Sequence, residues 1–242
     1  MKIALTIEKV GSGFGGAENT VAMFARVMHD AGHAVTIFAR IAGGLDLPSE
    51  VRVELLPLGP LGKLRWLRAV RFAQEAAKAV GGGRFDLVIG FNKTYAQDVL
   101  IAVAGTHPGT LMCNRARFRS PMQRALWSLG KRINPTQIGF RWITKQAFGG
   151  TRPGEPGGDR GPFVIAPSEL IAEHFRRFHD VPQDRIAVVP NGIRLPDPPP
   201  TEEEIRVTRA AFRQKANLAE TDVAALFLAW NYALKGLEPL LE

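Results

Sequence analysis

The sequence predicts an α/β protein with a doubly wound, mostly parallel sheet of the Rossmann-like type. Short apolar runs alternate with amphipathic helical patterns along the chain, and a glycine-dense turn at residues 11–16 joins the first run to the first helix. Apolar runs of this kind are typical of parallel strands that are covered by helices on both faces. With 242 residues and 45% apolar content, the chain has enough apolar side chains to bury a full core.

Each expected element follows from its residue pattern. The first helix is expected over residues 17–31, because apolar side chains recur there at helical spacing and Gly32 follows as a left-handed cap. The expected strands are residues 2–7, 34–39, 51–56, 85–90, 99–104, 163–166 and 186–189. The other expected helices are residues 62–80, broken stretches within 115–148, and a helix from the Ser168 cap to residue 178.

A proline-rich segment divides the chain into two parts. Residues 194–200 read RLPDPPP, and we interpret them as a stiff linker because proline neither continues a helix nor donates to a sheet. Residues 1–193 then form one domain. Residues 201–242 are expected to begin a second domain with a capped helix to residue 217, a strand at 223–230 and a helix from residue 236. A piece of this length does not close a core unaided, so we expect the second domain to be truncated.

Composition excludes several classes of site. The single cysteine, Cys113, excludes an internal disulfide and a cysteine-cluster zinc site, and no metal site is expected. No stretch reaches the roughly 20 apolar residues that span a bilayer. The N-terminus enters a strand without the apolar core of a signal peptide. These features favour a cytoplasmic protein.

The net charge of +8 is concentrated in one region. Residues 99–154 contain no Asp or Glu, and their cations would attract an anionic membrane surface. The predicted membrane-surface residues are Arg115, Arg117, Arg119, Arg124, Lys131 and Arg132. The aromatic residues between them are candidate interfacial anchors, or core residues behind a solubilising face: Phe118, Trp127, Phe140 and Trp142. Nucleic acid is not an expected partner, since no recognised binding module accompanies the charge.

The glycine-dense turn predicts an anion site. The first N–H groups of a helix lack intrahelical partners, and glycine at Gly15 and Gly16 lets the main chain approach a phosphate closely. Gly11, Gly13 and Gly16 also spell the G-x-G-x-x-G pattern of dinucleotide-binding proteins. An acidic residue normally ends the second strand of such proteins, but Arg40 stands here, which would suit an NADP-type 2′-phosphate. A tight turn without a ligand is the third interpretation.

An ordered series of motifs resembles family 4 glycosyltransferases of the GT-B fold. The motifs are GGAE at 15–18, AGHAV at 31–35, FDLVIG at 85–90, VIAPS at 164–168, IAVVPNGI at 186–193 and LKGL at 234–237. Together they extend over nearly the whole chain. Within the family, residues 91–93 (FNK), Asp98, Val99 and His107 are most similar to the lipopolysaccharide core glucosyltransferases.

The resemblance implies a GT-B N-terminal domain that holds the acceptor and the beginning of a C-terminal domain that holds the donor. It implies retaining transfer of a hexose from a nucleotide-sugar, UDP- or GDP-linked, to a glycan or glycolipid acceptor, without a metal or other cofactor. By position in the motifs, His107 is the candidate catalytic residue near the transferred sugar, and Asn92 and Lys93 are candidate acceptor contacts. Gly15, Gly16 and Lys235 are the candidate contacts to the donor phosphates.

Two other functions stay open from the sequence. One is an NADP-dependent oxidoreductase that uses the glycine-rich turn. The other is a non-catalytic module that docks on an anionic membrane, or on a partner carrying the missing C-terminal domain. The family's second-domain carboxylates have no counterpart before Glu242, so we expect this chain alone to transfer sugar poorly. The expected location is cytoplasmic, at the inner face of the membrane.

Overall fold

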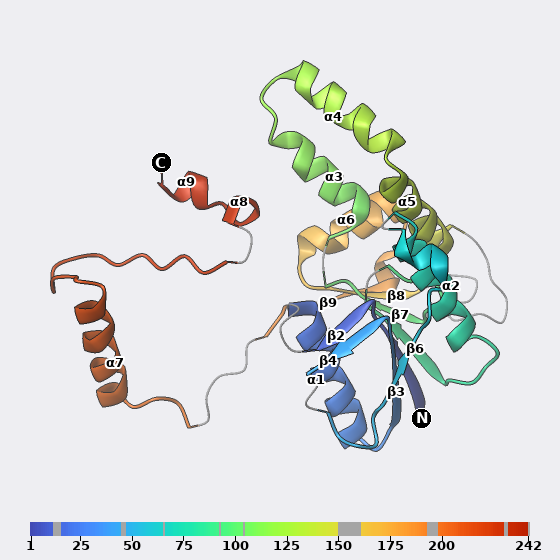
Figure 1. The fold of residues 1–242 in the computed structure, drawn as a ribbon, viewed down its shortest axis with the longest axis horizontal. Helices are drawn as coiled ribbons and strands as arrows, with labels where there is room; N and C mark the ends of the chain where they lie inside the picture. The colour runs from blue at the N-terminus through green and yellow to red at the C-terminus, as the bar shows by residue number, and fades with distance from the viewer. Residues whose placement is uncertain are drawn as a thin grey trace. The chain divides into compact units, whose positions relative to one another are not determined.

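The computed structural model describes residues 1–11, 16–44, 47–64, 66–91, 93–103, 105–149, 161–192, 198–229 and 232–241. The chain divides into two compact units, Met1–Asn191 and Gly192–Glu242, and each is described by itself (Figure 1).

A seven-stranded sheet forms the centre of the first unit. Its strand order is β5-β3-β1-β6-β7-β8-β9, and every neighbouring pair is parallel. The strands are β1 (Lys2–Thr6), β3 (Ala34–Ala39), β5 (Arg52–Leu55), β6 (Leu87–Gly90), β7 (Val99–Ile101), β8 (Phe163–Ala166) and β9 (Ile186–Val188). This confirms the predicted doubly wound sheet. The strand order reverses between β1 and β6, because the chain leaves β1 toward β3 and β5 and later returns to β6 on the other side.

Six α-helices and two short 3-10 helices accompany the sheet in the described part of this unit. They are α1 (Gly16–Asp30), η1 (Pro60–Lys63), α2 (Arg68–Val80), α3 (His107–Ala116), α4 (Pro121–Ile133), α5 (Pro135–Phe148), α6 (Glu169–His179) and η3 (Gln183–Arg185). The start of α3 was missed by the sequence prediction, which placed helix only from residue 115. Thr106 caps α3 by accepting a hydrogen bond from the Gly109 N–H at 3.2 Å, and Pro108 suits its first turn.

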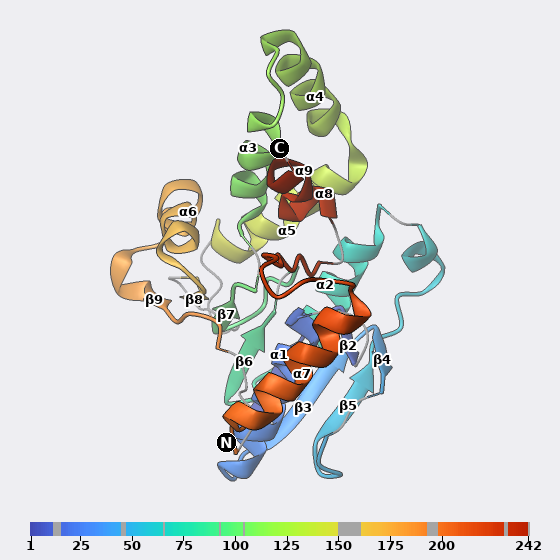
Figure 2. The same ribbon diagram turned by 90° about the vertical axis from the view of Figure 1, so that its left-hand side faces the viewer.

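Alternation along the central strands assigns helices to the two faces. Ile3 and Leu5 of β1 pack with Val21 of α1, whereas Ala4 packs with Val80 of α2, and all four side chains are buried. On the α2 face the sheet is also covered by α6, which packs on β7 and β8, and α2 contacts α5. Figure 2 shows α3 and α4 extending beyond the sheet, with α5 beneath them. Period-two alternation between two helical layers therefore builds the core.

A second, two-stranded parallel sheet explains the residues between β1 and the glycine-rich turn. It pairs β2 (Lys9–Gly11) with β4 (Ile41–Gly43). Gly11 has φ 143°, and a Cβ there would lie 1.8 Å from the Gly43 carbonyl oxygen. Glycine is required at this position because the two backbones approach so closely. The sequence analysis did not predict this sheet.

The second unit contains three helices among its described residues: α7 (Glu202–Lys215), α8 (Tyr232–Lys235) and α9 (Leu237–Leu241). Thr201 and Glu204 form the predicted capping box of α7. The predicted strand at residues 223–230 is wrong for the described residues 223–229, which pair with no strand and leave Val223 and Leu228 exposed. An apolar run becomes a strand only when a neighbouring strand pairs with its N–H and C=O groups.

Gly90, the last residue of β6, generates a testable prediction about packing. A Cβ at Gly90 would lie 1.9 Å from Gln97 Oε1 and 2.7 Å from Thr94 Oγ1, both on buried side chains. We expect Gly90→Ala to lower the free energy of unfolding by about 1–3 kcal/mol through overpacking. The matched control is Gly130→Ala in α4, where an added Cβ meets no atom within 4 Å.

The control should raise the free energy of unfolding by about 0.5–1 kcal/mol, because alanine is the better helix former. Urea denaturation followed by circular dichroism measures both variants. An unchanged midpoint for Gly90→Ala would contradict the proposed steric role of Gly90.

Candidate functional site

A buried polar cluster lies where the strand order reverses. Thr6 at the end of β1 pairs in register with Gly90 at the end of β6, and Thr94 and Gln97 follow β6. The Thr6 hydroxyl donates to Thr94 Oγ1 at 3.4 Å, and the Thr94 hydroxyl donates to Gln97 Oε1 at 2.5 Å. Gln97 is 0% exposed, yet its Nε2 has no hydrogen-bond partner among the described residues. A buried amide without an acceptor costs free energy, so Gln97 Nε2 is a donor available to a ligand or a water molecule.

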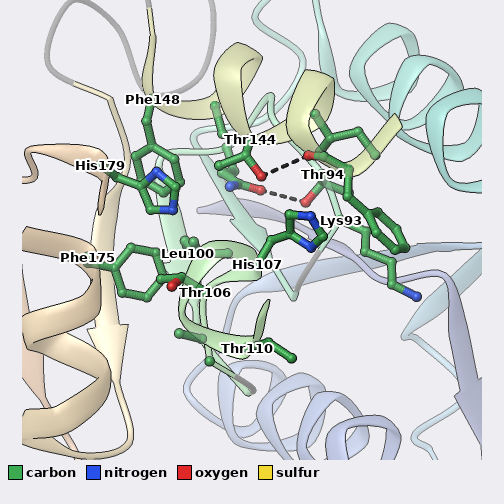
Figure 3. A pocket seen from close by; sticks show the side chains of 16 residues that line it. Lys93, Thr94, Leu100, Thr106, His107, Thr110, Thr144, Phe148, Phe175 and His179 are labelled. Atoms are coloured by element: carbon green, nitrogen blue, oxygen red, sulfur yellow. Dashed lines mark hydrogen bonds between the residues drawn. The ribbon is translucent and has the colours of Figure 1, made fainter. Parts of the chain in front are cut away.

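A cavity of about 240 Å³ opens beside this cluster on the α2 face of the sheet (Figure 3). Leu100 of β7 and Ala102, which follows this strand, form its floor. Residues of α3, α5 and the end of α6 form its walls. The carboxyl ends of the strands beside a reversal of strand order are the usual ligand position in open α/β sheets. The lining combines apolar side chains with about as many polar ones that converge on the cavity, as in small-molecule sites.

His107, the predicted catalytic residue, lines this cavity as the first residue of α3. Its ring packs against Phe140 with centroids 5.5 Å apart, and its buried Nε2 has no partner among the described residues. Burial lowers the pKa of His107 below its usual value, and the nearby Arg141 guanidinium lowers it further. The imidazole is therefore neutral at pH 7 and offers the cavity a hydrogen bond without a charge.

His179 is a second imidazole at the cavity, and the sequence analysis did not predict it. It ends α6 and stacks on Phe148 of α5, with centroids 4.8 Å apart and an interplanar angle of 14°. Burial lowers the pKa of His179 to about 4; the Asp180 carboxylate opposes this shift and His107 adds to it. No motif in the sequence marks His179, because α3, α5 and α6 meet only in the folded chain.

Lys93, a predicted acceptor contact, stands at the rim of the cavity. Its backbone is left-handed, with φ 52°, and its Nζ lies 3.3 Å from Glu8 Oε2 and 5.5 Å from the Phe140 ring centroid. Glu8 also pairs with Arg40 at 3.3 Å. The Arg40 charge is thus engaged by a carboxylate, and this counts against its proposed role in binding a 2′-phosphate.

A second cavity of about 320 Å³ adjoins the first. The two share four lining residues: His107, Thr144, Phe148 and His179. The second cavity adds the cations of Arg141 and Lys145, which lie one turn apart on α5. The chain therefore places a cavity of mixed apolar and polar lining next to a cationic one, with two histidines in the shared wall.

The other predicted site residues are Gly15, Gly16, Asn92 and Lys235. Gly16 begins α1, while Gly15 and Asn92 lie outside the described residues. Lys235 ends α8 in the second unit and is exposed. The proposed phosphate contacts of Gly15, Gly16 and Lys235 stay predictions.

The predicted membrane-surface cations lie on α3, α4 and the turn between them: Arg115, Arg117, Arg119, Arg124, Lys131 and Arg132. Arg124 and Lys131 are half-buried rather than exposed. Arg124 Nε donates to the Phe118 carbonyl at 2.7 Å, and Lys131 Nζ lies 5.4 Å from the Trp127 ring centroid. The other cations of this set are exposed.

The four aromatic residues of this region are half-buried and each packs against another ring, so both interpretations from sequence stay open. Phe118 and Trp127 pack against each other with centroids 5.9 Å apart, Phe140 lines the cavity, and Trp142 packs against Tyr95 at 5.6 Å. The exposed apolar residues of α4 are instead Met122, Leu126, Leu129 and Ile133. These four side chains are 58–70% exposed, and their spacing places them on one face of the helix.

Within the described residues, no group of three or more His, Cys, Asp or Glu side chains is arranged to hold a metal ion. No described helix is both long and apolar enough to cross a membrane.

A known protein family and several solved structures are similar to this chain. The family model described as Glycosyltransferase Family 4 matches residues 14–196. The structure resembles WaaG, a glycosyltransferase involved in lipopolysaccharide biosynthesis, with a TM-score of 0.71 and 19% identity over 99% of this chain and 58% of that chain. It also resembles the sucrose-phosphate synthase of Thermosynechococcus elongatus, with a TM-score of 0.52 and 14% identity over 91% of this chain and 53% of that chain. No curated protein matches the sequence.

His179 generates a prediction about stability and pH. Its pKa is about 4 in the folded chain, against about 6.5 for an unperturbed histidine. As the pH falls from about 7 toward 4, His179 takes up a proton in the unfolded chain but stays unprotonated in the folded chain. The free energy of unfolding therefore falls in this pH window. We expect a loss of roughly 1–2 kcal/mol, after discounting for partial solvent exposure of the ring.

The variant His179→Phe preserves the stack on Phe148 and should remove most of this loss, leaving a smaller part from His107. Urea denaturation at several pH values between 7 and 4 measures both chains. The interpretation is wrong if parent and variant lose stability with the same slope.

Proposed function

This chain belongs to glycosyltransferase family 4, and on that premise we propose that it takes part in hexosyl transfer from a nucleotide-sugar to a cell-envelope or lipid-linked glycan. One observation carries the proposal. A cavity with a neutral imidazole and a buried amide that has no partner in the described part of the chain lies at the strand ends of a GT-B N-terminal domain, beside the reversal of strand order. The chain spans 58% and 53% of the two solved relatives, so the activity of the whole protein is part of the proposal.

The proposed reaction retains the anomeric configuration and uses no metal, with a UDP- or GDP-hexose as donor. The leaving diphosphate then needs stabilisation from protein groups. The N-terminus of α1, which begins at Gly16, supplies unpaired N–H groups and the positive end of a helix dipole. Lys235 is the proposed second contact to the diphosphate, and Gly15 the proposed close approach of the main chain.

His107 suits a place beside the transferred sugar because it is neutral. A charged imidazolium would repel the positive charge that develops on the sugar during departure of the diphosphate. Burial and Arg141 both lower the pKa of His107, which favours the uncharged ring. We assign it a hydrogen bond to a sugar hydroxyl and assign Lys93, at the rim, and Asn92 contacts to the acceptor.

We also propose that α4 holds the protein at the inner face of the membrane. Met122, Leu126, Leu129 and Ile133 form an exposed apolar stripe, and two exposed cations are Arg115 on α3 and Arg119 in the turn before α4. An amphipathic helix with cationic flanks lies in the interface of anionic lipid. Such an attachment would bring the acceptor cavity close to a lipid-linked substrate.

Transfer is tested with radiolabelled UDP- and GDP-hexoses and a bacterial glycolipid extract. We expect slow incorporation of labelled hexose into the glycolipid that requires this protein and persists in EDTA. NMR of the product should show that the donor's anomeric configuration is preserved. His107→Ala should lower the rate at least about tenfold, the lower range for loss of a group that stabilises a transition state.

Titration with NADPH beside the transfer assay distinguishes the glycosyltransferase from the oxidoreductase. Binding of NADPH, seen as energy transfer from tryptophan, in the absence of any hexose incorporation would contradict the proposal and favour an oxidoreductase.

Membrane attachment is tested by cosedimentation with neutral and anionic vesicles. Leu126→Ser combined with Leu129→Ser should weaken binding to anionic vesicles at least about tenfold, since burial of each leucine contributes on the order of 1.5–3 kcal/mol. The matched control is Leu170→Ser on α6, because Leu126 and Leu170 are both 63% exposed.

Arg115→Gln with Arg119→Gln should weaken only the salt-sensitive part of the binding, by about 1 kcal/mol per charge. Equal binding of all these variants would contradict the assignment of α4 as the membrane-facing element.

A further inference from the structure

We propose that the two adjoining cavities form one bipartite acceptor site, in which a saccharide ring occupies the first and an anionic substituent of that saccharide, such as a phosphate, occupies the second. This inference rests on the proposed function and names the chemical class of its acceptor. It goes beyond family membership because it is drawn from side chains of α3, α5 and α6.

The first cavity fits a single sugar ring. Its volume of about 240 Å³ is below the ~300–1,000 Å³ of drug-sized ligand pockets, so it suits a ring rather than a longer chain. Gln97 Nε2 and His107 Nε2 are buried and have no hydrogen-bond partner among the described residues, so a polar ligand group would satisfy both. Thr144 donates its hydroxyl proton to the Phe140 carbonyl at 2.9 Å, which leaves its oxygen free to accept.

An acyl chain suits this cavity less well than a sugar. It would cover Gln97 Nε2 and His107 Nε2 without giving either a hydrogen bond, and each would bear the full desolvation cost. The Phe140 and Phe148 rings provide apolar surface for the C–H faces of a pyranose, whose hydroxyls point outward from its edge. A hydroxylated ring thus matches both the polar and the apolar parts of the lining.

The second cavity has the charge for an anion. Among the described residues of its lining, Arg141 and Lys145 are the cations and Asp180, at the C-cap of α6, is the acidic residue. Arg141 Nη2 donates to the Arg132 carbonyl at 2.7 Å, and this contact holds the guanidinium in place before a ligand arrives. Two cations against one carboxylate leave a net positive charge that favours a phosphate or carboxylate.

The shared wall joins the two halves into one site. His107, Thr144, Phe148 and His179 line both cavities, and Figure 3 shows Phe148 and His179 together at one side of the first cavity, with His107 nearer Lys93. Arg141 lies close enough to His107 to lower the pKa of the imidazole, so a cation of the second cavity interacts electrostatically with a group that lines the first. A ring in the first cavity can therefore direct a charged substituent toward Arg141 and Lys145.

The test measures binding of methyl hexosides, their monophosphates and inorganic phosphate to the full chain by calorimetry, without a donor. The best monophosphate should bind at least about tenfold more tightly than its neutral parent and than inorganic phosphate. Lys145→Gln and Arg141→Gln should each reduce this preference to about threefold or less and leave affinity for the neutral hexoside unchanged. Added salt should reduce the preference.

Two further variants keep the inference falsifiable. Gln97→Met should weaken the hexoside and its monophosphate by the same factor, because it removes a contact to the ring alone. Lys63→Gln, which removes an exposed cation on η1 outside both cavities, should leave every affinity unchanged. Thermal unfolding confirms that each variant is folded.

Equal affinity for hexoside and monophosphate would overturn the inference. So would a preference that survives both cation substitutions, or inorganic phosphate binding as tightly as the monophosphate. Because no donor is present, loss of this preference in a chain that still transfers hexose refutes the bipartite site alone. An intact preference in a chain that transfers nothing refutes the proposed function alone.

Discussion

The parallel pairing of β1 with β6 is the constraint on which the site depends. At this pair the strand order reverses, so the chain leaves β1 into α1 on one face and leaves β6 toward the opposite face. The register sets Thr6 beside Gly90, and the missing Cβ of Gly90 makes room for Thr94 and Gln97. A larger residue there would fill the space from which Gln97 reaches the cavity.

Burial separates neutral groups from charged ones around this edge of the sheet. His107 and His179 are held uncharged because desolvation lowers the pKa of each imidazole. The charges lie farther out, with Lys93 at the rim and Arg141 and Lys145 in the adjoining cavity. A ring with hydroxyls fits the neutral part, and an anion fits the charged part. This difference in burial supports the proposed acceptor, which carries both a neutral sugar ring and an anionic group, over a purely apolar one.

The α4 helix shows how side-chain contacts redistribute a group of charges that is concentrated in the sequence. The sequence marked the cations correctly as a concentrated group, but Arg124 and Lys131 turn back onto Phe118 and Trp127. The aromatic residues are consequently occupied within the helical pair. The aliphatic residues of α4 remain exposed because α3 and α5 cover only its other side.

The sequence by itself determined the doubly wound parallel sheet, the approximate positions of its seven strands and the cap of α7, because these follow from local periodicity and capping residues. Only the tertiary structure decided that β2 and β4 pair, that residues 223–229 form no strand, and that Gln97, Thr144 and His179 share a cavity with His107. The physical reason is the separation in sequence between the residues that interact. Local patterns record the preferences of neighbouring residues, whereas strand pairing and cavities need segments far apart in sequence to meet, and a buried amide is recognised as unpaired only when all its neighbours are in place.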